Sequence, residues 1–368
     1  MRKLVLAAVM LLVLVGAGST SARSDQPKMF GVFETYRPDL VAKDGFTVVE
    51  RDLWVTAGNH HYSDLPATTR QPFETYMTYA QNHGLKVVLN VWQVGWPIKG
   101  QQYPPPTRPN QWRGMCDVAK DAVMMYPSIT GLVVGAEPNS HHFWSGQTGA
   151  ATAYTAWLST CYTDIKQVRP DVQVYGGALA SRAGPGGTSP QDFIAGMCQA
   201  YQKSGRSGPI MDGFDMHWYS DDAPNTQHTN SISLGDYDQL EGLLSCFGQG
   251  PMPILWGEGG YQSQIPKQEM NRYSKDFAPT KYAVDPQTQA AWYAQAVRMV
   301  QCQPYAVGLF IFHMVDDPQP GGWQSGLYYA NPWRSLQGAA RYADKPKDAL
   351  TAVEQAVQAA QSGNVQCR

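Results

Sequence analysis

Short apolar or β-branched runs alternate along this chain with longer segments in which apolar side chains recur every three or four residues. The first pattern is typical of buried strands and the second of amphipathic helices. The predicted strands span residues 29–33, 46–55, 86–91, 131–134, 172–175, 211–216, 254–256 and 306–312. The predicted helices span residues 39–43, 70–83, 112–125, 150–168, 190–203, 236–246, 286–301 and 349–360.

Eight strands that alternate with helices predict a parallel sheet, and this number favours a closed (β/α)8 barrel over an open doubly wound sheet. No low-complexity linker or change of composition divides the chain. We therefore expect a single TIM-barrel domain with long loops at its C-terminal face. Enzymes with this fold place their chemistry at the C-terminal ends of the strands, so the residues that follow each run are the candidates for a functional site.

The first 22 residues have the pattern of a secretory signal peptide. Arg2 and Lys3 precede an uncharged apolar run over residues 4–16, and small residues follow as far as Ala22. The run is short against the roughly 20 residues that a bilayer requires. We expect cleavage near Ala22, after which residues 23–368 form a secreted catalytic domain with no membrane partner.

Export to an oxidising compartment makes disulfides the expected state of the six cysteines. No CxxC pair occurs, and five of the cysteines lie in segments with a helical pattern. Consecutive helices are neighbours in the outer ring of a barrel, so we predict that the cysteines pair in sequence order. The predicted pairs are Cys116 with Cys161, Cys198 with Cys246, and Cys302 with Cys367.

Charge and composition narrow the choice of partner. The 28 Lys and Arg residues nearly balance the 30 Asp and Glu residues, and the resulting net charge of -2 excludes the basic field that nucleic-acid binding needs. Aromatic residues are plentiful, with 11 Trp, 20 Tyr and 11 Phe. Tyr and Trp suit surfaces that are both apolar and hydrogen-bonding, and sugars present such a surface. We therefore expect a carbohydrate partner.

Two glutamates each follow a predicted strand directly. Glu137 comes after the run 131–134, and Glu258 comes after the run 254–256. The fourth and seventh strands of a barrel face each other across its mouth, so we expect the two carboxyl groups to meet there. Glycoside hydrolysis needs one carboxylic acid to protonate the leaving oxygen and a second carboxylate to attack the anomeric carbon or to activate water. This pair supplies both groups.

The segments around these glutamates resemble those of retaining glycoside hydrolases of clan A, in the style of families 39 and 5. In that clan the acid/base glutamate follows strand four in an Asn-Glu-Pro motif, which residues 137–139 resemble, and the nucleophile ends strand seven, as in residues 255–261. The resemblance implies that Glu137 is the general acid/base and Glu258 the nucleophile.

The same resemblance implies a set of supporting residues. Residues 214–219 resemble the strand-six motif in which a His and a Tyr approach the nucleophile, which points to His217 and Tyr219. Arg51 matches an arginine that such enzymes keep near the nucleophile. The implied activity is the double-displacement cleavage of O-glycosidic bonds, with no cofactor.

Further residues at the ends of the predicted strands suit sugar binding in a cleft for an oligosaccharide or polysaccharide. These candidates are Asn90, Trp92, Trp144, Tyr261 and Trp323. The most important departure from the clan pattern is Ala136, which stands where an Asn normally contacts the sugar 2-hydroxyl. Either a polar side chain such as Asn90 or His142 replaces that contact, or the substrate differs at carbon two.

One other interpretation follows from the same residues, and two kinds of site are not expected. A secreted glycan-binding barrel that has lost catalysis is the alternative that Ala136 favours, although both glutamates are retained. A catalytic metal is not expected, because the histidines lack HExxH or any other ligand spacing. We likewise expect no dinucleotide or phosphate-binding loop, because no GxGxxG or P-loop motif follows a strand.

Overall fold

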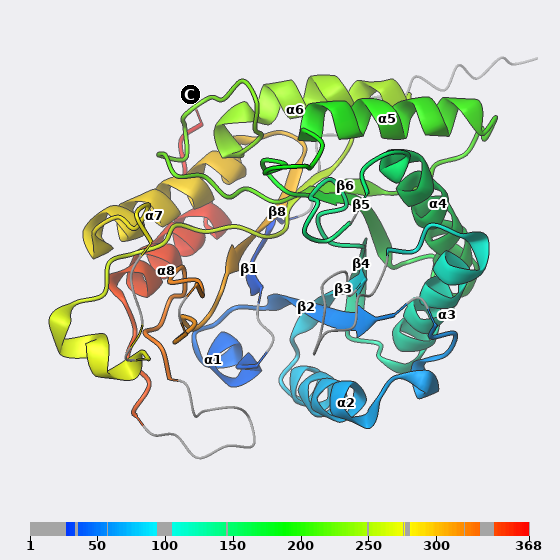
Figure 1. The fold of residues 1–368 in the computed structure, drawn as a ribbon. Helices are drawn as coiled ribbons and strands as arrows, with labels where there is room; N and C mark the ends of the chain where they lie inside the picture. Colours follow the sequence, from blue (N-terminus) through cyan, green and yellow to red (C-terminus); the bar gives the residue numbers. More distant parts are fainter. Residues whose placement is uncertain are drawn as a thin grey trace, which may run out of the picture.

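The computed structural model shows eight parallel strands closed into a barrel in the order β1 to β8, with β8 paired to β1. It describes residues 27–33, 36–56, 58–93, 105–144, 146–248, 250–274, 276, 280–319, 321–331 and 342–367. Figure 1 shows the helices arranged around the central strands. The predicted (β/α)8 fold is therefore confirmed, whereas the predicted signal peptide over residues 1–22 lies outside the described residues.

The strands agree closely with the predicted apolar runs. They are β1 (Met29–Phe33), β2 (Val48–Val55), β3 (Lys86–Gln93), β4 (Ile129–Val134), β5 (Gln173–Leu179), β6 (Gly213–Met216), β7 (Ile254–Trp256) and β8 (Ala306–Phe312). The largest difference is in β5, which continues past the predicted end at residue 175. Gly176 and Gly177 carry no side chain to extend the apolar pattern, and at Gly177 a Cβ would collide with the ring of Phe214 on β6.

The helices also follow the predicted segments. They are α1 (Pro38–Lys43), α2 (Ala67–Asn82), α3 (Pro109–Met125), α4 (Ala150–Val168), α5 (Pro190–Lys203), α6 (Tyr237–Leu244), α7 (Pro286–Cys302) and α8 (Asp348–Gln361). Proline begins α1, α3, α5 and α7, a position where its missing N–H is not needed. Segment 236–246, predicted as one helix, is α6 with a short 3-10 helix at each end.

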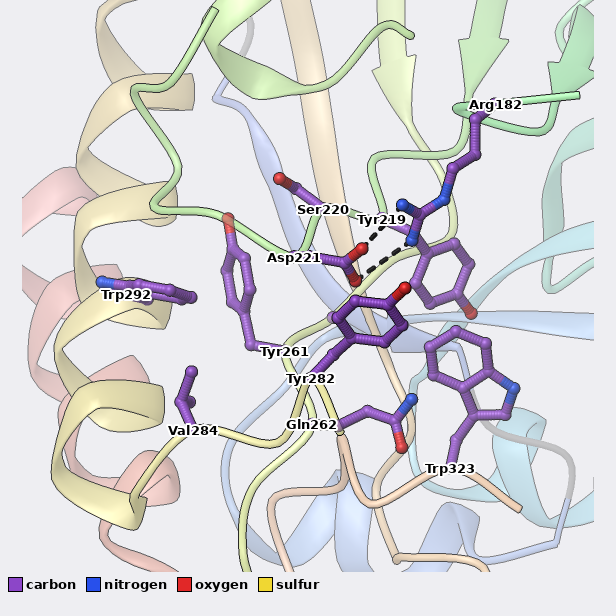
Figure 2. Close-up of a pocket in the computed structure, with 11 residues that line it drawn as sticks. Arg182, Tyr219, Ser220, Asp221, Tyr261, Gln262, Tyr282, Val284, Trp292 and Trp323 are labelled. Atoms are coloured by element: carbon purple, nitrogen blue, oxygen red, sulfur yellow. Dashed lines mark hydrogen bonds and ion pairs between the residues drawn. The ribbon is translucent and has the colours of Figure 1, made fainter. Parts of the chain in front are cut away.

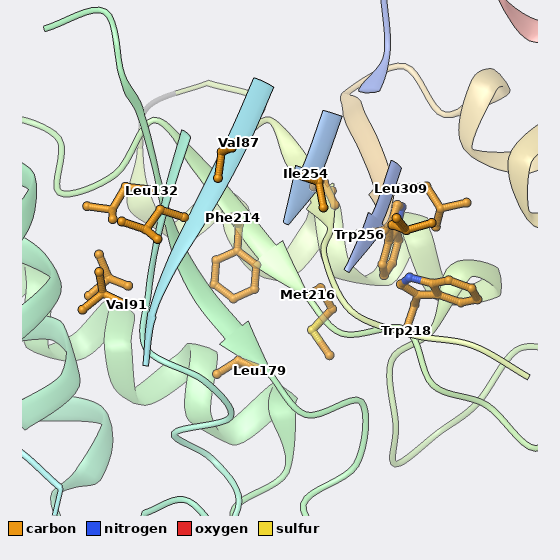
Figure 3. Packing of buried hydrophobic residues seen from close by; sticks show 14 of the residues in the cluster. Val87, Val91, Leu132, Leu179, Phe214, Met216, Trp218, Ile254, Trp256 and Leu309 are labelled. Atoms are coloured by element: carbon orange, nitrogen blue, oxygen red, sulfur yellow. The ribbon is translucent and has the colours of Figure 1, made fainter. Parts of the chain in front are cut away.

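Each strand has two buried faces with different neighbours. Side chains such as Val87, Leu132 and Trp256 point outward and pack against the helices in the main hydrophobic core (Figure 3). A second cluster, which includes Val48 and Phe310, fills the interior of the barrel. Successive side chains on a strand point to opposite faces, so Glu50 and Asp52 of β2 share the inward face of Val48. This alternation places acidic groups inside the barrel.

Three disulfides connect the outer layer of the fold, and they are the predicted pairs. Their Cα–Cα distances are 4.8, 6.0 and 5.2 Å for Cys116–Cys161, Cys198–Cys246 and Cys302–Cys367. The first joins α3 to α4, the second joins α5 to the 3-10 helix after α6, and the third ties the C-terminal segment to α7. Within the part of the chain that the structure describes, no helix is both long and apolar enough to cross a bilayer.

Candidate active site

A cavity of about 720 Å³ opens at the C-terminal ends of the strands. The C-terminal half of each strand, or the loop that follows it, contributes residues to its walls. Seven of the ten predicted site residues line it, namely Asn90, Trp92, Glu137, His217, Tyr219, Glu258 and Trp323. The structure therefore brings together most of the residues that the sequence places far apart.

Glu137 reaches the cavity through an unusual backbone conformation. It has a φ of 42°, in the left-handed region that a non-glycine residue rarely adopts. Its backbone N–H donates to the carbonyl of Ala178, at 2.7 Å, and the side chain of Asn139 accepts from the N–H of Ala180, at 2.8 Å. These bonds tie the turn after β4 to the end of β5. Backbone strain held by its surroundings in this way is concentrated at functional sites.

Glu258 is fixed by residues of the loop that follows β6. The hydroxyl of Tyr219 donates to its Oε1 at 2.7 Å, and its backbone carbonyl accepts from the N–H of Trp218 at 2.8 Å. Its neighbour Gly257 donates its backbone N–H to the carboxylate of Asp215 at 3.0 Å. The Glu258 side chain is 17% exposed, so it is held firmly yet open to a ligand.

His217 lies between the two glutamates. Its Nδ1 is 2.9 Å from Oε1 of Glu137, and its Nε2 is 4.0 Å from Oε2 of Glu258. Burial by itself disfavours the charged imidazolium, but the neighbouring carboxylates outweigh it and raise the pKa of His217 to about 9. A proton is therefore held at the contact of His217 with Glu137 at neutral pH, and the ring of His217 bridges the two glutamates.

The two carboxylates approach closely. One oxygen of Glu137, one oxygen of Glu258 and one ring nitrogen of His217 lie within 4.8 Å of one another. A divalent cation could bind these three atoms only after His217 has lost its proton, because a protonated imidazole nitrogen has no lone pair for a metal.

Three further acidic side chains lie inside the barrel around Glu258, and the sequence analysis did not assign them to the site. Burial, together with the charges of neighbouring carboxylates, raises the pKa of Asp52 to about 7 and that of Glu50 well above its usual range. Burial also raises the pKa of Asp215 to about 7, against the opposing charge of His217. Burial raises the pKa of Glu258 as well. The positive charges of Arg51 and His217 act against the shift at Asp52, and that of His217 acts against the shift at Asp215, but burial outweighs them.

The structure corrects the position of Arg51. Its guanidinium lies over the rings of Tyr76 and Phe73 on α2, 5.0 and 5.6 Å from the ring centroids, and it donates to the carbonyl of Asp52. It does not line the cavity. The physical reason is the two-residue period of β2, because Glu50 and Asp52 point into the barrel and Arg51 between them must point outward. An acid, Asp52, thus occupies the inward position near Glu258.

Two aromatic candidates are also corrected. Trp144 is 1% exposed and packs in the hydrophobic core, while its neighbour Phe143 lines the cavity. Tyr261 is 2% exposed, packs against Trp218 and Trp292, and lines a smaller pocket beside the main cavity. In both loops the sequence identifies an aromatic segment, but the geometry of the turn decides which ring faces the cavity.

Aromatic rings form one wall of the cavity. Trp92 makes an edge contact with Trp54 at 5.7 Å and a tilted contact with Phe143 at 5.4 Å. In the loops after β6 and β8, the ring centroid of Tyr219 lies 4.5 Å from that of Trp323. Trp54 could have been found from the period of β2, since it shares the face of Asp52. Arg182 and Ser181 were missed because the sequence pattern ended β5 too early.

Asn90, in the C-terminal half of β3, and Ala136, after the neighbouring strand β4, both line the cavity that Glu137 enters. Both the amide nitrogen and the amide oxygen of Asn90 are buried and have no hydrogen-bond partner among the described residues. Ala136 is held through its backbone, which exchanges two hydrogen bonds with the side chain of Gln93 at 2.9 and 3.2 Å. The wall therefore offers unused hydrogen-bonding groups at Asn90 and a small side chain at Ala136.

Comparison with known structures agrees with this architecture. A family 39 glycoside hydrolase from the gut symbiont Bacteroides cellulosilyticus WH2 is similar with a TM-score of 0.59 and 16% identity, over 91% of this chain and 64% of that one. Glycoside hydrolase GH5_18 from Streptomyces cattleya, in complex with GlcNAc, has a TM-score of 0.61 and 16% identity, over 93% of this chain and 82% of that one. A monomeric β-xylosidase from Caulobacter crescentus CB15 has a TM-score of 0.54 and 15% identity, over 89% of this chain and 67% of that one.

These similarities show the fold, which this chain shares with barrels of glycoside hydrolase families 39 and 5. The chain spans 64% of the length of the family 39 structure. No family model and no curated protein matches the sequence. The fold that the motif resemblance implied is therefore confirmed, and the chemistry rests on the geometry of the site itself.

Proposed function

We propose that this protein is a retaining glycoside hydrolase that cleaves O-glycosidic bonds in an oligosaccharide or polysaccharide. The observation that carries the proposal is the approach of Glu137 and Glu258 from opposite strands to within 4.8 Å. Carboxyl groups of retaining enzymes are about 5–5.5 Å apart, whereas inverting enzymes keep about 6.5–9.5 Å to admit a water. The short separation supports attack by a carboxylate over attack by water.

The side chains have roles that follow from their contacts. In the first step Glu137 donates a proton to the glycosidic oxygen while a carboxylate oxygen of Glu258 attacks the anomeric carbon, and the leaving sugar departs as an alcohol. In the second step Glu137 takes a proton from water, which attacks the same carbon and releases Glu258. The hydrogen bond from Tyr219 orients the attacking carboxylate, and His217 orients both acids.

The walls of the cavity support a carbohydrate substrate. Trp54, Trp92 and Phe143 offer faces for sugar rings, and Asn90 offers unused hydrogen-bonding atoms. The similar structures include a β-xylosidase and an enzyme in complex with GlcNAc. Xylose-based and GlcNAc-based glycosides are therefore the first substrates to test.

We also propose that the protein is secreted after cleavage near Ala22. The signal-peptide pattern and the three disulfides both support export. Expression of the full chain with a compatible export system, followed by N-terminal sequencing of the extracellular protein, tests this. Retention in the cell with an intact N-terminus would contradict it.

The test of the activity is a panel of aryl β-glycosides, oligosaccharides and polysaccharides assayed with matched variants. Glu137→Gln lowers turnover by about 10²–10⁴-fold, the usual contribution of a general acid. Glu258→Gly abolishes it, and added azide restores cleavage with a product of inverted configuration. Glu354→Gln on α8, far from the cavity, is the control and keeps full activity. Proton NMR of the first anomer formed by the unaltered protein shows retention.

A second candidate function is glycan binding without catalysis, which Ala136 favours because the clan's usual contact to the 2-hydroxyl is missing. In that case the panel gives no product, while calorimetry detects binding that Glu258→Gly does not abolish. A cation site is distinguished in the same assay, because chelation by EDTA then removes activity or binding. Full activity in EDTA contradicts a required cation.

A further inference from the structure

A second hollow of about 170 Å³ lies beside the main cavity, among the loops that follow β5, β6, β7 and β8 (Figure 2). Arg182, Tyr219 and Trp323 line both hollows. The same side chains therefore form the boundary between them. A chain of sugar units that lies over Glu258 is within reach of this second pocket.

The lining of the second pocket combines aromatic rings with hydrogen-bonding groups. Tyr261, Tyr282 and Trp292 contribute rings, and Ser220 and Gln262 contribute polar side chains. Figure 2 shows Trp292 projecting from α7 and Trp323 on the other side, with Tyr261 and Tyr282 between them. Tyr282 is 47% exposed, and the Nζ of Lys281 lies over its ring, 4.7 Å from the ring centroid. Sugars offer both an apolar face and hydroxyl groups, so such a lining suits them.

The charges of the pocket favour a neutral ligand. Arg182 and Asp221 form a two-pronged ion pair, with N–O distances of 2.7 and 3.1 Å, so each charge cancels the other. Their side chains are 53% and 26% exposed, which leaves atoms free for hydroxyl groups. A strongly charged ligand would have to break this pair, whereas a sugar hydroxyl can hydrogen-bond to it as it stands.

The floor of the pocket is already formed. The ring of Tyr261 packs 5.0 Å from Trp292 and 5.6 Å from Tyr293, and its backbone N–H donates to the Tyr293 hydroxyl at 3.1 Å. A rigid aromatic floor loses little freedom when a ligand binds, which is typical of preformed sites.

We propose that this pocket binds one neutral sugar unit of the substrate that is not itself cleaved, as the next unit of a chain or as a branch. The inference rests on the proposed glycosidase function and deepens it. It makes the substrate an oligosaccharide or polysaccharide that spans both hollows, so that small monoglycosides use only the main cavity.

The experiment fills the pocket without touching the glutamates. Val284 lines it, and the backbone bonds of Val284 to Gln262 and Gln264, at 2.9 and 2.8 Å, do not involve its side chain. Val284→Trp fills the space, and Val284→Ala is the matched control at the same position. Tyr282→Ala removes the exposed ring as a second, independent change.

Two groups of probes are compared. The monoglycosides are aryl β-xylosides and β-glucosides, and the oligosaccharides are xylotetraose, cellotetraose, chitotetraose and a branched arabinoxylan oligosaccharide. Val284→Trp and Tyr282→Ala raise KM for the cleaved oligosaccharide about ten-fold, equal to about 1.4 kcal/mol. Both variants leave kcat/KM for the monoglycosides unchanged. The control Val284→Ala leaves kcat/KM unchanged for every probe. Calorimetry in a Glu258→Gln background shows the same loss of affinity.

Each outcome decides one of the two proposals. If the protein cleaves oligosaccharides and neither Val284→Trp nor Tyr282→Ala changes their KM, the second pocket is refuted and the glycosidase proposal stands. If the protein binds oligosaccharides without cleaving them, and Val284→Trp weakens that binding, the second pocket stands and the glycosidase proposal is refuted. If the unaltered protein neither cleaves nor binds any probe, both proposals fail.

Discussion

The backbone of Gly257 lies against the carboxylate of Asp215, to which its N–H donates at 3.0 Å, and any Cβ at Gly257 would collide with that carboxylate. Gly257 immediately precedes Glu258. The contact therefore couples a buried acid on β6 to the position of the proposed nucleophile at the end of β7.

We predict that Gly257→Ala displaces Glu258 and lowers kcat/KM by about 100-fold, because misplacing a reacting group by about 1 Å has effects of that size. The added methyl also costs about 1–3 kcal/mol of unfolding free energy as overpacking. Steady-state kinetics and denaturant unfolding measure both effects. Gly242→Ala on α6, where a Cβ meets no atom within 4 Å, is the control. Equal activity in both variants would refute the coupling.

Tyr219→Phe removes the hydrogen bond to Glu258, and we expect kcat to fall about 10- to 100-fold, matching the roughly 1.5–3 kcal/mol of a bond to a charged group. That bond lowers the pKa of Glu258, against burial that raises it. Its loss moves the acidic limb of the kcat/KM profile to higher pH. Tyr201→Phe, which removes a bond to the carbonyl of Gly208, leaves the profile in place. An unshifted limb in Tyr219→Phe would exclude this role.

Stability is expected to fall as pH rises from about 4 to 9. Burial, with the neighbouring charge of Glu258, raises the pKa of Asp52 from 3.8 to about 7, so the native state binds more protons than the unfolded state between those values. The raised pKa of His217, about 9 against 6.5, acts in the same direction at higher pH. Urea unfolding at pH 5 and pH 8 measures the difference. Asp52→Asn reduces it, and Asp238→Asn on the exposed surface of α6 does not.

Lys347 is fully buried and donates to Asp316 at 2.7 Å, to Ser263 at 3.1 Å and to the carbonyl of Gln324 at 2.9 Å. Lys347→Met leaves the Asp316 carboxylate buried without its cation, which costs about 3–5 kcal/mol of unfolding free energy. Denaturant unfolding measures this loss. The control is Lys120→Met, because Lys120 pairs with Asp117 at 2.6 Å on the surface of α3, where the two side chains are 31% and 34% exposed and such a pair is worth at most about 1 kcal/mol.

Asn90 and Asn139 provide a contrast between a binding and a structural amide. Asn90→Ala lowers kcat/KM about 10- to 100-fold, since a contact to a sugar hydroxyl is worth several kcal/mol at most. It leaves the stability of the fold unchanged, because the Asn90 amide has no hydrogen-bond partner among the described residues. Asn139→Ala breaks bonds to Ala180 and Thr188 and costs about 1–3 kcal/mol of stability. Thermal unfolding beside kinetics separates the two. A large loss of stability in Asn90→Ala would contradict a binding role.

Local sequence was enough to predict the elements and the position of two glutamates at the mouth of the barrel. The alternation of apolar runs and helical periodicity depends on burial of one face of each element, so it predicted the eight strands, and the barrel then defined which strand ends meet. Pairing of the cysteines followed from the same reasoning, because neighbouring helices in a ring are consecutive in the sequence.

The tertiary structure alone decided which side chains at those strand ends face the cavity. Arg51 and Asp52 are adjacent in sequence, yet the register of β2 turns the first toward α2 and the second toward Glu258. Trp144 and Phe143 differ in the same way, through the turn after β4. The left-handed backbone of Glu137 and the buried acids around Glu258 arise from contacts between strands far apart in the chain. Such contacts leave no local pattern in the sequence, because their energy comes from packing and burial that exist only once the barrel has closed.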